Sequence, residues 1–183
     1  KIGKDGKRVG LYNNKQIRSL SALGKQLDIE YISADIIRIF TESPDFRRKE
    51  LDRFCSLYFD EYSKHLKAYE KVIKQKNRLI KSTQDKNGIR LWNKQLLEYA
   101  GYIVALRKQA LVCLSEELVT LSRDVEDSFS RDLVIHYKNF ALQEHDNESY
   151  LDILSKKLED SIEKEIMVGY SLYGPHRDDF YIT

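Results

Sequence analysis

The chain has 183 residues, of which 42% are hydrophobic and 33% are charged, so it is long enough to bury a core. Its formal net charge of +2 excludes a protein that attracts nucleic acid through an overall positive field, and any DNA contact must depend on a local cluster of cations. Because only 8 glycines and 2 prolines interrupt the chain, we expect a mainly helical fold.

Two further features limit the class of protein. The sequence has no apolar run of membrane-spanning length, so we expect no membrane partner. Cys55 and Cys113 lie on helical patterns without metal-ligand spacing, which favours core cysteines over a disulfide or a metal site. We therefore expect a cytoplasmic protein, and we identify no metal ligands.

The first 43 residues contain sequence patterns that are typical of short strands. Asp5-Gly6 and Asn13-Asn14 are good turn pairs between β-type segments, which predicts a hairpin. Residues 27–32 alternate apolar and polar side chains, as a strand with one buried face does. Residues 1–43 are therefore predicted to be a region of strands that precedes the helices.

A helix is predicted to begin at Pro44 and to run to about Phe59. Ser43 offers an N-cap hydroxyl, Pro44 suits the first helical position, and Asp45 complements the positive end of the helix dipole.

Two long amphipathic helices follow. The first spans about residues 60–81, and its apolar face is formed by Tyr62, Leu66, Tyr69, Ile73 and Ile80. A polar turn over residues 82–88 separates it from a second helix, whose inner face carries Trp92, Leu96, Tyr99, Ile103, Leu106, Ala110, Leu114 and Leu118. Two such helices joined by a short turn are predicted to pair as an antiparallel hairpin.

The first long helix also carries a basic stripe on the face turned away from its apolar side. We use this name for Lys67, Lys71, Lys74, Arg78 and Lys81. Such a stripe is either a solvated helix face or a track for DNA phosphates, since regularly spaced cations can bind a DNA backbone without reading bases.

The last third of the chain is predicted to form a strand over 132–137, a helix over 149–167, and two strands over 169–173 and 179–182. Between these strands Gly174 and Pro175 fix a sharp reversal, which is followed by His176, Arg177, Asp178 and Asp179. This charged turn is either a structural salt-bridge network or a site near a nucleotide or a second subunit. We favour the structural role, in which Arg177 pairs with a carboxylate in a partly buried network.

Several segments resemble the RecF family of DNA replication and repair proteins. Residues 171–180 read Ser-Leu-Tyr-Gly-Pro-His-Arg-Asp-Asp-Phe and resemble the family signature Thr-x-x-Gly-Pro-His-Arg-Asp-Asp-Leu. Residues 43–52 are similar to the family segment Ser-Pro-x-x-Arg-Arg-x-Phe-Leu-Asp, matched here by Ser43, Pro44, Arg47, Arg48 and Asp52. Residues 69–81 and 91–96 resemble two family helices, although Lys76 stands where the family has arginine.

The resemblance implies an α+β, mainly helical fold, in which an antiparallel long-helix hairpin is flanked by strands from the edge of an ABC-type ATPase head. RecF is similar to SMC and Rad50 proteins, with their coiled coil shortened to a helical lobe. On this basis residues 1–43 are head-edge strands and a hairpin, residues 44–167 are the lobe, and residues 168–183 return to the head.

The motifs that hold ATP in such proteins are absent from the sequence. Residues 3–8 have the wrong spacing for a Walker A loop, and neither a Walker B strand nor the signature loop occurs. We therefore expect this chain to be the central portion of a longer polypeptide and not to bind or hydrolyse ATP itself. A free-standing helical-hairpin interaction module without nucleotide chemistry is the alternative.

For the complete protein, the resemblance implies an ATPase that uses ATP and Mg²⁺ and closes as an ATP-dependent homodimer on DNA. It also implies binding to DNA at gaps between single-stranded and double-stranded regions, and RecR and RecO as partners. The corresponding roles are recombinational repair, replication restart and the SOS response.

Overall fold

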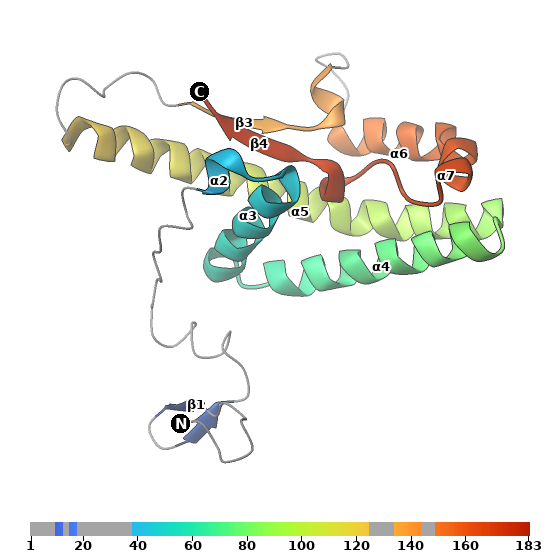
Figure 1. The fold of residues 1–183 in the computed structure, drawn as a ribbon, viewed down its shortest axis with the longest axis horizontal. Coiled ribbons are helices and arrows are strands. Elements are labelled where there is room, and N and C mark those ends of the chain that lie inside the picture. The colour runs from blue at the N-terminus through green and yellow to red at the C-terminus, as the bar shows by residue number, and fades with distance from the viewer. Residues whose placement is uncertain (1–9, 13–14, 18–37, 125–133, 144–148) are drawn as a thin grey trace. The chain divides into compact units, whose positions relative to one another are not determined.

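The computed structural model describes residues 10–12, 15–17, 38–124, 134–143 and 149–183 (Figure 1). The chain divides into two compact units, residues 1–38 and 39–183. In the first unit, β1 (Gly10–Tyr12) pairs antiparallel with β2 (Lys15–Ile17), which confirms the hairpin predicted at Asn13-Asn14. The turn at Asp5-Gly6 and the strand over 27–32 lie outside the described residues.

The short helix α2 (Arg38–Thr41) spans the boundary between the units, and α3 (Pro44–Tyr58) follows it in the second unit and starts where the sequence predicts. Ser43 has extended dihedral angles, and its carbonyl oxygen accepts the N–H groups of Phe46 and Arg47 at 3.0 and 3.2 Å. The predicted cap bond from the Ser43 hydroxyl is not formed, so the backbone and Pro44 define this helix start.

The long helices α4 (Tyr62–Ser82) and α5 (Lys86–Asp124) pack side by side as the predicted antiparallel hairpin (Figure 1). Buried side chains from both predicted apolar faces include Tyr62, Tyr69, Ile80, Leu96, Ile103 and Ala110, and Ala100, which was not predicted, is buried as well. Helix α5 also contacts α3, α6 and β3, so it is the central element of this unit.

The connection between the two long helices is shorter than the predicted turn over 82–88. Helix α5 already begins at Lys86, because the Asp85 carboxylate accepts the Asn87 N–H at 3.0 Å and supports the first helical turn. Gly88 lies within this turn, where an added Cβ would come within 2.7 Å of a Leu79 methyl carbon. The Asn-Gly pair therefore serves close helix packing, and the predicted turn boundary was wrong.

The C-terminal part combines a two-stranded sheet with two helices. Strand β3 (Ile135–Lys138) pairs antiparallel with β4 (Asp179–Ile182), with Ile135 opposite Ile182 and Tyr137 opposite Phe180. Between them lie η2 (Phe140–Gln143), α6 (Tyr150–Asp160), α7 (Ile162–Val168) and η3 (Pro175–Arg177).

The structure corrects two predictions in this region. The helix predicted over 149–167 is divided at Ser161, which lets α6 pack on α5 while α7 contacts α4. The strand predicted over 169–173 is not formed, because Ser171 N–H donates to the Asn77 side chain and Leu172 N–H donates to Glu165. With these donors engaged by side chains, the segment has no ladder to a neighbouring strand.

None of the described helices combines the length and the apolar character needed to cross a membrane. The proposed boundaries between the head-edge regions and the lobe stay a prediction.

Candidate functional site

The charged turn begins at a glycine that no other residue could replace without strain. Gly174 has φ +132°, and an added Cβ would lie 2.5 Å from the Tyr69 hydroxyl oxygen. Pro175 then starts the short helix η3, and Arg177 N–H donates to the Gly174 carbonyl at 2.8 Å. The reversal predicted from Gly-Pro is therefore formed, and it is packed directly against α4.

His176 is held as a neutral imidazole between α4 and its own loop. Its Nδ1 lies 2.5 Å from the Tyr69 hydroxyl and its Nε2 lies 3.3 Å from the Ser171 carbonyl oxygen. The carbonyl can only accept, so Nε2 carries the proton and Nδ1 accepts from Tyr69. Burial lowers the pKa of His176 to about 3. The imidazole is therefore neutral at pH 7 and does not serve as a general acid or base there.

The lowered pKa of His176 predicts that the stability of the protein depends on pH. Its pKa in the unfolded chain is near 6.5, so between pH 6.5 and about 3 the folded protein binds fewer protons than the unfolded chain. The stabilising contribution is complete above pH 6.5 and is lost as the pH falls. Relative to His176→Asn, we expect the wild-type free energy of unfolding to fall by about 2 kcal/mol between pH 6.5 and 5, as measured by urea titration. A constant difference over this range would show that His176 binds its proton equally well in the folded and the unfolded chain.

The two aspartates of the turn take separate partners, as expected for neighbours that point to opposite faces. Asp179 forms a two-pronged ion pair with Arg47 of α3, with both N–O distances 2.7 Å. Burial raises the pKa of Asp179, but the hydrogen bonds from Arg47 outweigh it, and the pKa lies below its ordinary value.

Asp178 points into the interior. Its Oδ2 accepts the Tyr137 hydroxyl of β3 at 2.6 Å, and its backbone carbonyl accepts from Arg48 of α3 at 2.8 Å. Its other oxygen is buried without a hydrogen-bond partner among the described residues. Burial raises the pKa of Asp178 to about 6 despite the Tyr137 hydrogen bond. Both carboxylates are therefore committed to structural contacts.

Arg107, which was not predicted to be a site residue, links the two family motifs. It is 2% exposed and forms a two-pronged ion pair with Asp52 of α3, with N–O distances of 2.8 and 2.9 Å. A third nitrogen donates to the Pro175 carbonyl at 2.7 Å. The sequence contains one signal for its burial, because Arg107 lies on the apolar face of α5 between Ile103 and Ala110.

The motif that begins at Ser43 and the charged turn thus meet in space. Arg47, Arg48 and Asp52 lie on the face of α3 that reaches residues 175–179, either directly or through Arg107. Ser43 and Pro44 form the start of that helix and make no side-chain hydrogen bond to the turn among the contacts of the described residues.

A second buried ion pair fixes the segment before the turn. Lys76 of α4 and Glu165 of α7 are both fully buried, with their charged atoms 2.8 Å apart. Lys76 also donates to the Ser171 hydroxyl at 3.0 Å, and Glu165 accepts from that hydroxyl at 3.1 Å. Burial lowers the pKa of Lys76, and the Glu165 carboxylate opposes this effect. Lys76, at the position where the family has arginine, is therefore a buried cation that holds α7 and Ser171 against α4.

Arg177 does not behave as predicted. Its side chain is exposed, donates to the Ser171 carbonyl at 3.1 Å, and lies over the Tyr170 ring at 4.8 Å. No carboxylate pairs with it among the described residues, because Arg47 engages Asp179 and Tyr137 engages Asp178. The expectation that Arg177 belongs to a partly buried ion pair was wrong.

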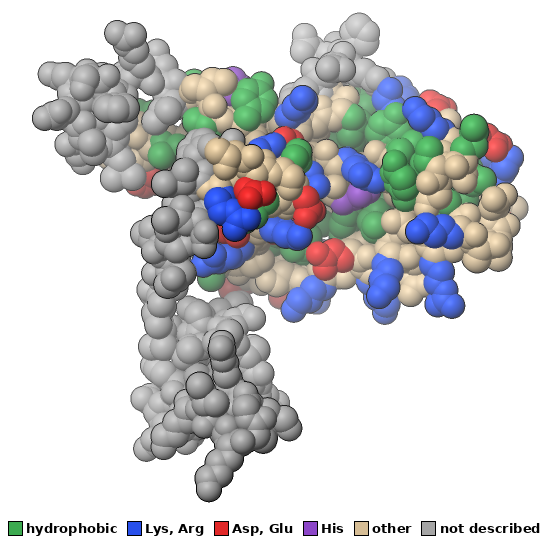
Figure 2. Space-filling model, in the orientation of Figure 1, with side chains coloured by type: hydrophobic (Ala, Val, Ile, Leu, Met, Phe, Trp, Pro, Cys, Tyr) green, Lys and Arg blue, Asp and Glu red, His purple; other side chains and the backbone are tan. Residues whose placement is uncertain are grey.

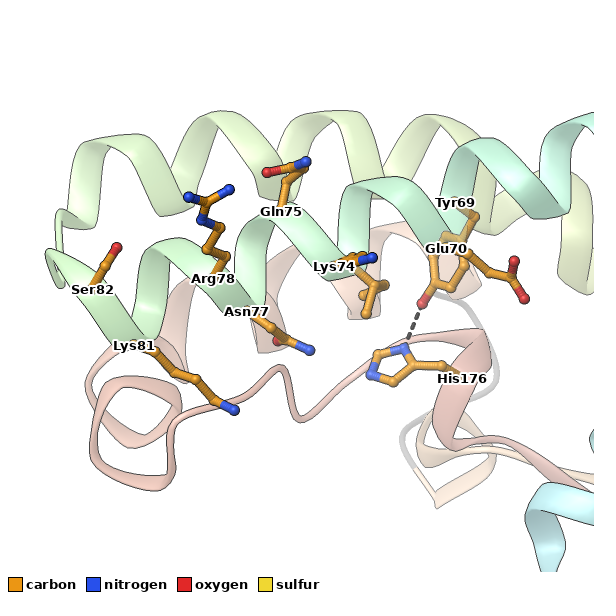
Figure 3. A pocket seen from close by; sticks show the side chains of 10 residues that line it. Tyr69, Glu70, Lys74, Gln75, Asn77, Arg78, Lys81, Ser82 and His176 are labelled. Carbon is orange, nitrogen blue, oxygen red and sulfur yellow. Dashed lines mark hydrogen bonds between the residues drawn. The ribbon is translucent and has the colours of Figure 1, made fainter.

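All five members of the basic stripe are exposed, and none has an ion-pair partner within the described residues. Figure 2 shows Lys and Arg side chains projecting along the edge of the molecule formed by α4. Beside this edge lies a groove of about 790 Å³ between α4 and His176 (Figure 3). Lys74, Arg78 and Lys81 line the groove, whereas Lys67 and Lys71 lie outside it.

The described residues offer no grouping of three or more His, Cys, Asp or Glu side chains that could hold a metal ion. Cys55 is buried as predicted, and burial raises the pKa of its thiol to about 12. Cys113 is exposed, so the prediction that it is a core cysteine was wrong. The contacts of the turn and of the buried ion pair can therefore hold α3, α4 and α7 together, and the basic stripe can present cations to a polyanion.

Comparisons with known proteins agree with the motif analysis. No protein-family model matches the chain. The chain is 34% identical over 187 residues to the DNA replication and repair protein RecF of Clostridium kluyveri, covering 100% of this chain and 50% of that protein. It is 31% identical over 188 residues to RecF of Staphylococcus carnosus, covering 97% of this chain and 50% of that protein.

A solved structure of the recombination mediator RecF with ATP, from the RecFOR pathway, matches 98% of this chain and 49% of its own length. Its TM-score is 0.79 at 24% identity, which establishes a common fold. The chain therefore spans about half the length of these relatives. Because these proteins match the chain over nearly its whole length and the RecF structure has the same fold, the chain is a relative of the RecF DNA replication and repair proteins.

Proposed function

We propose that the chain is the helical lobe, with adjoining head segments, of a longer RecF-like recombination mediator. The observation that carries this proposal is the end-to-end match to half of several RecF proteins, together with the RecF fold. The complete protein would be an ABC-type ATPase that dimerises on gapped DNA when ATP and Mg²⁺ are bound, and that works with RecR and RecO in recombinational repair and replication restart.

The residues of this chain do not fit a site for ATP or Mg²⁺. The sequence lacks the glycine-rich loop that wraps a triphosphate, and Asp178 and Asp179 are engaged by Tyr137 and Arg47. We therefore assign nucleotide binding to the rest of the polypeptide. In this proposal the charged turn performs no chemistry and joins the lobe to the segment that leads back towards the head.

Within this function we assign the basic stripe to the DNA backbone. These cations are exposed at helical spacing and have no carboxylate partner in the described part of the chain, so they can neutralise successive phosphates, and each phosphate contact releases a counterion. No base reading is required for this role, which suits a protein that recognises DNA structure.

Charge reversal in the full-length protein tests the assignment. The triple variant Lys71→Glu, Lys74→Glu and Arg78→Glu is expected to bind gapped DNA more weakly, with a similar loss for unrelated sequences. The slope of log affinity against log salt should flatten by roughly one unit per lost phosphate contact.

The matched control reverses three exposed lysines outside the stripe, Lys94, Lys108 and Lys164. It makes the same change in net charge and is expected to have a much smaller effect on affinity. Equal affinity and equal salt slope for the wild type and the stripe variant would show that the stripe is a solvated helix face that does not contact DNA.

A further inference from the structure

The groove beside α4 differs from an ordinary cationic surface because it is hollow and has an apolar floor. Tyr69 and Ile73 line its inner side, and three cations of the basic stripe line it as well. Glu70 lines the groove near Tyr69, so an anion is favoured towards Lys81 (Figure 3).

Asn77 supplies a donor whose orientation is fixed by the fold. Its Oδ1 accepts the Ser171 N–H at 2.7 Å, and because a backbone N–H can only donate, the side-chain oxygen must face Ser171. The amide nitrogen therefore points away from Ser171, and it has no partner among the described residues. Figure 3 shows this nitrogen directed into the space between Lys81 and His176.

His176 forms part of the wall of this groove and carries no charge at neutral pH. Both of its ring nitrogens are engaged, by Tyr69 and by the Ser171 carbonyl, so it neither repels nor binds an anion. The positive charge of the groove comes from Lys74, Arg78 and Lys81, and the oriented neutral donor comes from Asn77.

We propose that this groove is a phosphate subsite for single-stranded DNA, in which Lys74, Lys81 and the Asn77 amide bind one phosphodiester group. The apolar floor takes part of the adjoining nucleotide. A flexible single strand can enter a hollow beside the helix, whereas the phosphates of a rigid duplex contact only the exposed stripe. This inference rests on the proposed DNA-binding function and divides the stripe into two parts.

The test compares two pairs of substitutions in the full-length protein, each of which removes two positive charges from α4. Lys74→Gln with Lys81→Gln alters the groove, and Lys67→Gln with Lys71→Gln alters the stripe outside it. For a short oligothymidylate, measured by fluorescence anisotropy, we expect the groove pair to weaken binding about tenfold and the outer pair less than about threefold. For a blunt duplex of the same length, both pairs should cause similar losses.

Asn77→Asp provides an independent variant, because it keeps an oxygen for the Ser171 N–H and replaces the free donor by a negatively charged acceptor. We expect it to weaken oligothymidylate binding about fivefold or more with little change in melting temperature. Gln95→Glu, on the exposed surface of α5, makes the same charge change and is expected to leave this affinity nearly unaltered.

The outcomes separate this inference from the function on which it rests. Equal losses for both lysine pairs with oligothymidylate would overturn the subsite and leave a uniform phosphate track. No loss for either pair, with either DNA, would overturn the DNA role of the stripe as well. Displacement of oligothymidylate by inorganic phosphate or by polyglutamate at equal charge concentration would show recognition of charge alone, and would also overturn the subsite.

Discussion

Arg107→Ala is expected to lower the free energy of unfolding by about 3 to 5 kcal/mol, because it leaves the largely buried Asp52 carboxylate without its cation. The Pro175 carbonyl loses its donor in the same substitution. The loss should weaken the attachment of α3 and the charged turn to α5, since Arg107 of α5 contacts both. Urea unfolding followed by circular dichroism measures the effect.

Arg177→Ala is the matched control, since it removes an arginine from the same region. Arg177 is exposed and donates only to the Ser171 carbonyl among the hydrogen bonds of the described residues. We expect its loss to cost about 1 kcal/mol or less. A destabilisation by Arg177→Ala as large as that by Arg107→Ala would mean that the turn is organised around Arg177 after all.

Lys76→Met is expected to destabilise the protein by a similar amount, about 3 to 5 kcal/mol, because it leaves Glu165 as an unpaired charge in a fully buried position. Adding Glu165→Gln should recover most of the loss. The glutamine oxygen can still accept from Leu172 N–H and from the Ser171 hydroxyl, and no buried charge remains.

A double-mutant cycle over Lys76 and Glu165 measures this coupling directly. The expected coupling is large because burial removes the screening that makes exposed ion pairs weak. If Lys76→Met alone and the double variant were equally unstable, the loss would come from packing of the lysine side chain instead of from the charge left on Glu165.

The buried pair also explains why a lysine can occupy a position where the RecF family has arginine. The ammonium group of Lys76 meets one carboxylate and one hydroxyl, which are contacts that a compact point charge can satisfy. Lys76 therefore holds α7 and Ser171 against α4, and it is not one of the residues that line the groove.

The sequence by itself determined the elements that depend on local order. The 3.6-residue period of apolar side chains located α4 and α5 and the stripe of Lys67 to Lys81, and Ser43-Pro44 located the start of α3. The motifs around Arg47 and Asp179 identified the family. These patterns are local in the sequence, so they can be recognised without any knowledge of the fold.

Only the tertiary structure decided which charges meet. Arg47 and Asp179 are separated by 132 residues, and Arg107 and Asp52 by 55, so no spacing rule predicts their pairing. The break at Ser161 and the loss of the strand at 169–173 have the same origin, because contacts with α4 and α5 compete with local preference. Arg177 was assigned to the interior from its neighbours in the sequence, but the partners of Asp178 and Asp179 come from elements distant in the chain.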